Sequence, residues 1–220
     1  MRAAPQEQSD DVPRDSASPS ARVDADGRAD LVTPDAIAIA EGLLADDSFQ
    51  SARRIDPLVP DASGIYAIAV TDVRVLPAPF DTLATERGHS LNYIGKAQNL
   101  RSRFLEEELR GRRNGMFFRS LGALLGYRPL QGSLFERKNQ RNYRFTHEDT
   151  ASIVKWINAN LVVSFVGVEQ VLKPLEVELI KGRLPLLNLD DNSVKLPELE
   201  ALRRACRVIA STPQTALSAS

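Results

Sequence analysis

Two short apolar runs constrain the fold of this chain more than any other sequence feature. Residues Ser63–Val70 and Leu91–Ile94 are rich in β-branched and aromatic side chains, which are typical of strands. Pro77, Pro79 and Gly88 lie between the two runs, and residues of these types interrupt regular structure. The runs therefore predict a pair of strands joined by a long connection instead of a tight turn.

The remaining apolar periodicity predicts one more strand and a set of helices. Leu161–Val168 is a third β-rich run, and Ser133–Phe135 is a weaker candidate for a further strand. Helical spacing and capping residues predict helices at 34–46, 99–109, 117–125, 146–158, 171–184 and 197–209. Because no βαβ unit repeats, we expect an α/β chain of the α+β kind, with a small three-stranded, mostly antiparallel sheet flanked by helices.

The composition divides the chain into four parts. Residues 1–30 are rich in Asp, Ser, Ala, Arg and Pro without apolar periodicity, so we expect a disordered acidic tail there. A short helix and linker are expected over 31–60, the α/β domain over 61–192, and a C-terminal helix with a frayed tail over 193–220. A length of 220 residues with 43% apolar content suffices for one well-cored domain with extensions.

The cysteine and histidine content excludes several classes of site. Cys206 is the single cysteine, so an internal disulfide and a cysteine-rich zinc cluster are both excluded. His89 and His147 are the two histidines and lie too far apart in sequence to suggest a histidine-based metal site. The N-terminus lacks a signal-peptide pattern, and no apolar run approaches the roughly 20 residues that cross a bilayer. We therefore expect a cytoplasmic protein with no membrane association.

Charge is unevenly distributed along the chain, although the formal net charge is only -1. Residues 96–144 carry twelve cations against four anions, while the first sixty residues are acidic. Aromatic residues alternate with arginines over 117–145, as they do on nucleic-acid-binding surfaces. This segregation predicts a phosphate-binding surface; a solvated helix face is the alternative.

Two tripeptides carry the most specific signal. Gly64–Tyr66 lies on the first predicted strand and Tyr93–Gly95 on the second, and together they resemble the pair that names the GIY-YIG nuclease family. Arg103 follows ten residues after Tyr93, where this family places a helix arginine, and Glu176 lies in a segment that resembles the helix bearing its metal-binding glutamate. That segment also matches the family at Leu175, Leu179–Lys181, Pro185 and Asn188.

The resemblance covers about 130 of the 220 residues and implies both a fold and an activity. Within the family, the chain resembles the nuclease half of the bacterial excision-repair endonuclease, and more broadly the GIY-YIG restriction and homing endonucleases. A GIY-YIG fold and a metal-dependent endonuclease are therefore expected. The long connection between Tyr66 and Tyr93 departs from the family pattern, as does Glu107, which stands where a histidine is often found.

The resemblance assigns a catalytic role to five side chains. Tyr66 would be the general base, Tyr93 would help to order the water and the phosphate, and Lys96 would contact phosphate or lower the tyrosine pKa. Arg103 would hold the scissile phosphate with its planar guanidinium. Glu176 would bind Mg²⁺, or alternatively Mn²⁺, which keeps most of its waters when one carboxylate holds it. Taken singly, each of these residues also fits an ordinary structural role.

A tyrosine has an ordinary pKa near about 10, so as a base at neutral pH it needs cations nearby to depress that value. Lys96, Arg103 and the metal are the expected source of this effect. Glu178 competes with Glu176 for the metal role, but the surrounding register favours Glu176.

Five further residues are predicted to contact nucleic acid. They are Arg101, Arg112, Arg113, Arg119 and Asn188. DNA is the expected substrate, with RNA left open, and a second copy of the chain or a separate protein partner is expected to supply specificity. The alternative function is a catalytically weak nucleic-acid-binding module that needs a partner for cleavage. A third hypothesis is an interaction protein that uses the acidic tail.

Overall fold

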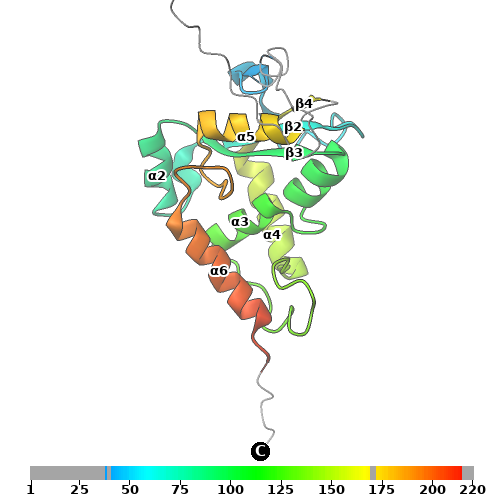
Figure 1. Cartoon of the computed structure of the whole chain (residues 1–220), viewed down its shortest axis with the longest axis vertical. Coiled ribbons are helices and arrows are strands. Elements are labelled where there is room, and N and C mark those ends of the chain that lie inside the picture. Colours follow the sequence, from blue (N-terminus) through cyan, green and yellow to red (C-terminus); the bar gives the residue numbers. More distant parts are fainter. Residues whose placement is uncertain (1–37, 39–40, 169–171, 215–220) are drawn as a thin grey trace, which may run out of the picture. The chain divides into compact units, whose positions relative to one another are not determined.

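One antiparallel sheet of four strands organises the part of the chain that the structure describes (Figure 1). The computed structural model describes residues 38, 41–168 and 172–214. The strands, in their order across the sheet, are β1 (Gln50–Ser51), β4 (Leu161–Gly167), β2 (Gly64–Val70) and β3 (Leu91–Ala97). β3 is therefore an edge strand, whereas β2 lies between two neighbours.

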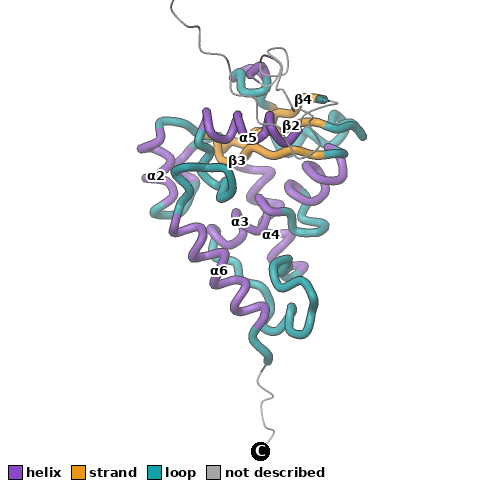
Figure 2. The backbone as a smooth tube through the Cα atoms, in the orientation of Figure 1, coloured by secondary structure: helices purple, strands orange, loops and turns teal. Residues whose placement is uncertain are grey.

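Helices cover both faces of the sheet, because successive residues of a strand point to opposite faces and β2 is apolar on both. Ile65 belongs to an apolar cluster with Leu175 of α5 (Leu172–Arg183). Tyr66 points the other way, into a larger core that several helices complete (Figures 1 and 2). These helices are α2 (Phe80–Arg87), η3 (Arg101–Leu109), α3 (Met116–Leu124), α4 (His147–Asn160) and α6 (Pro197–Ser211).

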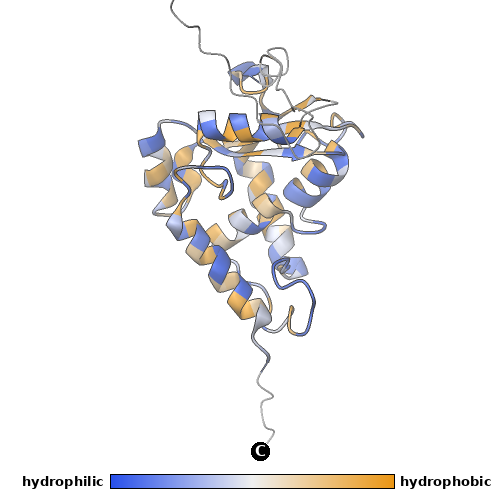
Figure 3. Ribbon diagram, in the orientation of Figure 1, coloured by the Kyte–Doolittle hydropathy of each residue, from blue (hydrophilic) through white to orange (hydrophobic). Residues whose placement is uncertain are grey.

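The predicted fold class is confirmed, with one strand added. The three predicted strands form the body of the sheet, and the two-residue β1 pairs with β4 at the other edge. The start of α4 follows from its capping residue, because the Thr146 hydroxyl accepts a hydrogen bond from the Asp149 amide at 3.0 Å. Apolar and hydrophilic residues alternate along the helices, as Figure 3 shows clearly for α6, which packs on α3.

The link between β2 and β3 is long, as predicted, but it contains two helices that the sequence did not predict. These are η2 (Val73–Val75) and α2 (Phe80–Arg87), and Pro79 is the N-cap of α2. One prediction in the connections is wrong. The segment near Ser133–Phe135 forms turns instead of a strand. Its backbone bonds to the end of α6 and to its own turns, so no strand partner remains.

The helix predicted at 99–109 is a π-helix, η3, whose backbone hydrogen bonds join residues five apart. An example is the bond from the Arg110 amide to the Leu105 carbonyl, at 2.9 Å. π-helical segments are rare and occur frequently at functional sites. In this chain η3 carries Arg103, one of the predicted catalytic residues.

Some predictions fall on residues outside the described part of the chain. They include the acidic tail over 1–30, residues 34–37 and 39–40 of the helix expected at 34–46, and the end of the chain after residue 214. The described remainder of that first region contains the 3-10 helix η1 (Asp46–Ser48). None of the helices in the described segments has the length and apolar character needed to span a bilayer.

Candidate active site

The edge of β3 that has no neighbouring strand is covered along only part of its length. The candidate site lies at the uncovered part. The segment after α5 closes the first half, where the Leu187 amide donates to the Asn92 carbonyl at 2.7 Å. The Asn188 side chain closes the middle: its amide oxygen accepts from the Ile94 N–H at 3.0 Å and its amide nitrogen donates to the Ile94 carbonyl at 2.9 Å. After Ile94, where these two hydrogen bonds end, β3 borders a cavity.

The side chain of Asn188 is buried, and both of its polar atoms bond to the backbone of Ile94. Asn188 therefore holds β3 in position. It also lines the cavity, so its contact with nucleic acid stays a prediction.

The cavity at this edge has a volume of about 250 Å³ and gathers most of the predicted catalytic side chains. Tyr93, Lys96, Arg103 and Glu176 all line it, although they come from β3, η3 and α5. Residues from both faces of the sheet can meet here because β3 has no neighbouring strand on this side.

Tyr66 does not line this cavity; its side chain is buried and packs on Gly95. A Cβ atom at Gly95 would lie 2.5 Å from the Tyr66 hydroxyl oxygen, so only glycine leaves room for the ring. Tyr66 pairs with Gly95, and Tyr93 pairs with Ile68, which places both tyrosines on one face of the sheet. Their ring centroids are 6.3 Å apart, and the ring of Tyr66 also stacks on Phe104 at 4.7 Å.

The protein's own groups raise the pKa values of both tyrosines. Burial is the largest cause for Tyr66 and Tyr93 alike, and the negative charge of Glu108 raises both values further. Arg103 acts in the expected direction and lowers both pKa values, but its effect is smaller. Without further positive charge, both phenols keep their protons at neutral pH.

Two glutamates fix the guanidinium of Arg103. One nitrogen lies 2.6 Å from the Glu107 carboxylate and the other 3.0 Å from that of Glu108. Hydrogen bonding between residues five apart in η3 brings Glu107 and Glu108, four and five positions on, to the same guanidinium. Burial opposes the charge on Arg103, but Glu108 and Glu107 outweigh it and raise its pKa.

Glu108 also ties η3 to α3. Its side chain is fully buried, and its carboxylate accepts hydrogen bonds from the amides of Met116 and Phe118, both at 3.1 Å, at the start of α3. Gly115 leaves room for it, since a Cβ there would lie 2.1 Å from a carboxylate oxygen. Burial raises the pKa of Glu108, while Arg103 and the two amides act against that rise.

Glu176 faces the cavity from α5 and is largely buried, with 13% of its side chain exposed. Burial raises its pKa, and the Lys173 ammonium, 3.3 Å away, lowers it in part. The same ammonium lies 2.5 Å from the Asp191 carboxylate. Glu178 instead has 60% of its side chain exposed, so the structure agrees with the register that favours Glu176.

A comparison with known families decides the relationship. The family model described as GIY-YIG catalytic domain matches residues 64–207, about two thirds of the chain. The chain belongs to the GIY-YIG family. The resemblance based on the two tripeptides is thereby confirmed. Membership of this family implies a nuclease-type catalytic domain that acts on nucleic acid. No curated protein and no solved structure gives a significant match.

The GIY-YIG match begins at the first residue of β2 and ends within α6. It therefore includes most of α6, whose Leu199 and Cys206 are buried in the same core as Tyr66. Cys206 is a free thiol.

The arginines predicted to bind nucleic acid occupy different environments in the GIY-YIG domain. Arg101 donates to the Val59 carbonyl at 2.6 Å and is about one third exposed. Arg112 and Arg113 have 69% and 72% of their side chains exposed, and each pairs with a glutamate of η3. These three can reach a ligand at the surface.

Arg119 requires a correction, because it is only 8% exposed. It donates to the Asn114 carbonyl at 2.5 Å, and its guanidinium lies 6.0 Å from the centre of the Tyr143 ring. Burial lowers its pKa to about 10, as does the neighbouring Arg203. We assign Arg119 to the interior instead of to a surface that nucleic acid contacts.

Sequence reasoning missed three residues of the site. Glu108 was not among the predicted site residues, and nothing in the sequence indicated that it is buried. Lys173 could have been found, because it lies three residues before Glu176 on a helix, within ion-pair spacing. Asp191 lies after α5 in a loop, and only the tertiary structure brings it to Lys173.

Proposed function

We propose that this chain is a metal-dependent endonuclease that hydrolyses phosphodiester bonds of nucleic acid, with DNA as the substrate. The observation that carries the proposal is the cavity at the edge of β3, which is lined by Tyr93, Lys96, Arg103 and Glu176. Hydrolysis of a phosphodiester needs an oriented water, a proton acceptor, positive charge beside the phosphate and help for the leaving oxygen. These side chains are of the types that supply those needs.

The residues of the cavity are suited to a hydrated Mg²⁺ or Mn²⁺. The Lys173 ammonium already lies between the carboxylates of Glu176 and Asp191, so this part of the cavity attracts a cation. In the described part of the chain no group of three or more acidic, histidine or cysteine side chains is placed to hold a metal. One or two carboxylates completed by waters is the arrangement that Mg²⁺ prefers. The metal would supply Lewis-acid stabilisation of the leaving oxygen.

Arg103 is suited to hold the scissile phosphate. A guanidinium carries five N–H donors, so its pairs with Glu107 and Glu108 leave donors free for a phosphate oxygen. The two glutamates fix its orientation in advance, which reduces the ordering required when substrate binds. Lys96 adds a further cation at the cavity; no carboxylate of the described residues lies within ion-pair distance of it.

Tyr66 is the proposed proton acceptor, and Tyr93 would orient the attacking water. Tyr93 lines the cavity, and the buried ring of Tyr66 lies 6.3 Å from that of Tyr93, in contact with Gly95. Because burial raises the pKa of both hydroxyls, positive charge brought by the metal and by Lys96 must offset that rise. Once a proton is taken from the water, Arg103 would stabilise the charge that develops on the phosphate.

A plasmid cleavage assay tests this proposal. Supercoiled DNA is incubated with the protein and Mg²⁺ or Mn²⁺, beside an EDTA control and the variant Glu176→Ala. We expect metal-dependent nicking that is lost in Glu176→Ala and kept in Glu178→Ala, a matched control because Glu178 lies on the same helix and is exposed. Cleavage that persists in EDTA or in Glu176→Ala would refute the assigned metal site.

The second candidate function is a nucleic-acid-binding module that needs a partner for cleavage. The raised pKa values of Tyr66 and Tyr93 favour it, as does the ion pair between Lys173 and Glu176. In that case wild type and Glu176→Ala would bind DNA equally and neither would cut it. The partner would be a second copy of the chain or a separate protein that brings specificity.

We also propose a cytoplasmic setting, which the free buried thiol of Cys206 supports.

A further inference from the structure

We propose that the segment Leu130–Arg144, here called the basic loop, is a docking surface for the sugar–phosphate backbone of nucleic acid. The basic loop lies between α3 and α4 and contributes no residue to the catalytic cavity. The inference rests on the proposed function in one respect, namely that the ligand of this chain is nucleic acid. The catalytic role of Tyr66, Arg103 or Glu176 does not enter into it.

The first observation is the amount of unpaired positive charge on the basic loop. Four cations and one anion lie within it, and all five side chains are exposed: Arg137, Lys138, Arg141, Arg144 and Glu136. Within the described residues, no carboxylate lies at ion-pair distance from any of the four cations. Their charge is therefore available to a polyanion.

The second observation is a cavity on the basic loop itself. It has a volume of about 570 Å³, and cations and amides line most of it: Arg137, Lys138, Arg144, Asn139 and Asn142, with Ser133 and Leu134. The Ser133 hydroxyl is buried and has no hydrogen-bond partner. A concave surface with cations around it lets several donors converge on the oxygens of one phosphate.

The third observation is that the basic loop is held in place on both sides. Leu134 and Tyr143 are buried in the main core. The Leu134 amide donates to the Ala210 carbonyl of α6 at 2.7 Å, and the Ser211 hydroxyl donates to the side-chain oxygen of Gln140 at 2.7 Å. A surface that is already ordered loses less conformational entropy when its ligand binds.

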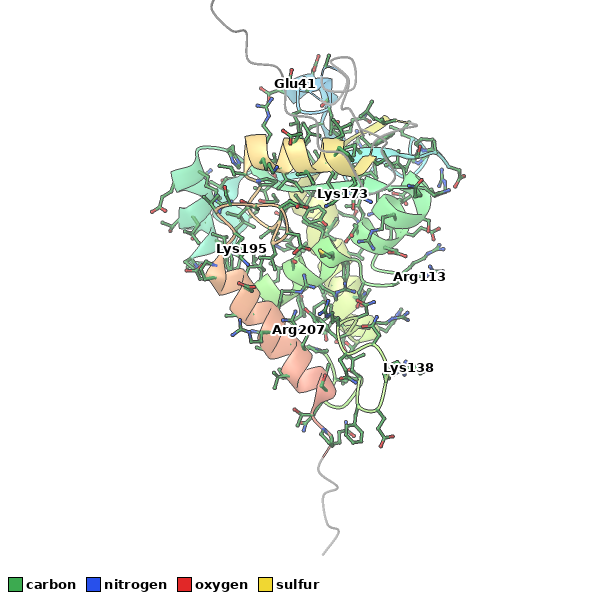
Figure 4. The ribbon with its side chains drawn as sticks, viewed as in Figure 1. Glu41, Arg113, Lys138, Lys173, Lys195 and Arg207 are labelled. Atoms are coloured by element: carbon green, nitrogen blue, oxygen red, sulfur yellow. The ribbon has the colours of Figure 1, made fainter. Side chains whose placement is uncertain are left out.

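Nucleic acid fits this surface better than an acidic protein does. Three of the four cations are arginines, whose planar guanidinium matches a phosphate with two parallel hydrogen bonds. Phe135 lies in the same loop, two residues before Arg137, and is 48% exposed, so its ring is available for stacking with an unpaired base. Figure 3 shows this loop as a hydrophilic segment, and in Figure 4 Lys138 projects to the same side of the ribbon as Arg113.

The test is DNA binding measured by fluorescence anisotropy in EDTA, so that no metal-dependent cleavage interferes. The triple variant Arg137→Gln, Lys138→Gln, Arg144→Gln is compared with wild type over a series of salt concentrations. Each phosphate contact contributes a slope of about -0.9 to log K against log salt, so we expect the slope to fall in magnitude by about 2.7. Affinity at 100 mM salt is expected to fall at least about tenfold.

A charge-matched control separates this surface from net charge. Arg53, Arg54 and Lys155 are exposed, and no carboxylate among the described residues pairs with them. The variant Arg53→Gln, Arg54→Gln, Lys155→Gln removes the same charge and is expected to keep both affinity and salt slope near wild type. An equal loss in both triple variants would overturn the proposal, as would an unchanged loop variant.

Two further outcomes distinguish this inference from the proposed function. A wild type that binds DNA but never cuts it defeats the endonuclease proposal, while the loop variant still decides the docking surface. A loop variant that keeps its DNA affinity but loses binding to poly-glutamate would overturn the docking surface in favour of an acidic protein partner. Because the mutated side chains are exposed, we expect the triple variant to fold. If it folds poorly, the single variant Lys138→Gln replaces it. Its slope of log K against log salt should fall in magnitude by about 0.9.

Discussion

Two arginine-rich regions of this chain look alike in sequence and differ in structure. In residues 101–113, every arginine pairs with a carboxylate, and the acceptors include the buried Glu108. In the basic loop, over residues 137–144, no described carboxylate pairs with a cation. In the first region the positive charge is therefore paired within the domain, that of the proposed phosphate-binding Arg103 included, whereas the second region leaves its charge free. Counting cations along a sequence does not distinguish these two uses.

The largest expected effect concerns Arg103, the arginine of the paired region that faces the catalytic cavity. Arg103→Ala should reduce cleavage by about 10² to 10³-fold, as removal of a donor to transition-state charge does elsewhere. DNA affinity should change less than about threefold, because the basic loop would carry the binding. Cleavage kinetics and anisotropy on the same preparation check both statements. A large loss of affinity with unchanged cleavage would reverse the division between the two regions.

The next effect concerns Glu108, which joins Arg103 to the start of α3. Glu108→Ala leaves the partly exposed Arg103 without one partner and two amides at the start of α3 without an acceptor, so we expect a loss of about 3 kcal/mol in the free energy of unfolding. Glu108→Gln should restore part of the stability, because its amide oxygen can still accept, while cleavage stays low. Urea denaturation and cleavage rates measure the two quantities. Glu106→Gln is the control, since Glu106 is partly exposed and pairs with the exposed Arg112.

The pH dependence of cleavage tests the tyrosines. A proton acceptor must be deprotonated, and the pKa values of Tyr66 and Tyr93 are raised in the folded protein. Cleavage should therefore increase with pH, by up to about tenfold per unit, from pH 6 to pH 9. Tyr66→Phe should remove both the activity and this rise. A rate that is flat over this range would argue against a tyrosine base.

The smallest effects compare two arginines within the paired region. Arg110 is largely buried and bonds to Asp56, to the Ala52 carbonyl and to Asn158, so Arg110→Ala should lower the free energy of unfolding by about 1 to 2 kcal/mol. Arg112 has 69% of its side chain exposed, and Arg112→Ala should change that free energy by less than about 0.5 kcal/mol. Equal effects in urea denaturation would contradict this difference in burial.

The same ion pair predicts a weak acid dependence of stability. The hydrogen bond from Arg110 lowers the pKa of Asp56 below its ordinary value of 3.8. A carboxylate whose pKa is lower when folded contributes stability above its ordinary pKa and loses it as pH falls. Stability should therefore decline as pH falls below about 4, and the decline should be smaller in Arg110→Ala. Thermal melting between pH 3 and pH 6 measures this difference.

Much of the fold could be predicted because it depends on local patterns. Apolar runs predicted β2, β3 and β4, and Thr146 predicted the start of α4. The helix α2 was missed because Pro79 was read as a breaker, whereas proline before a helix is compatible with its first turn. The two-residue β1 was missed because so short a strand exists only through its pairing with β4.

For the candidate site too, the sequence predicted some features and the tertiary structure decided others. Tyr66, Tyr93, Lys96, Arg103 and Glu176 could be selected from their spacing. Their convergence on one cavity depends on the open edge of β3 and on the packing of η3 and α5 around it.

The sequence by itself determined the family, the strands and the identity of the predicted catalytic side chains, because these depend on residue order and local periodicity. Only the tertiary structure decided which charges are free. Arg119, Asn188 and Glu108 are polar in sequence and buried in the fold, so hydrogen bonds and ion pairs within the domain occupy them. Arg137 and Arg144 remain at the surface because no acidic segment of the described chain reaches the basic loop. Electrostatic partners are set by distances in space, which charge along the chain does not reveal.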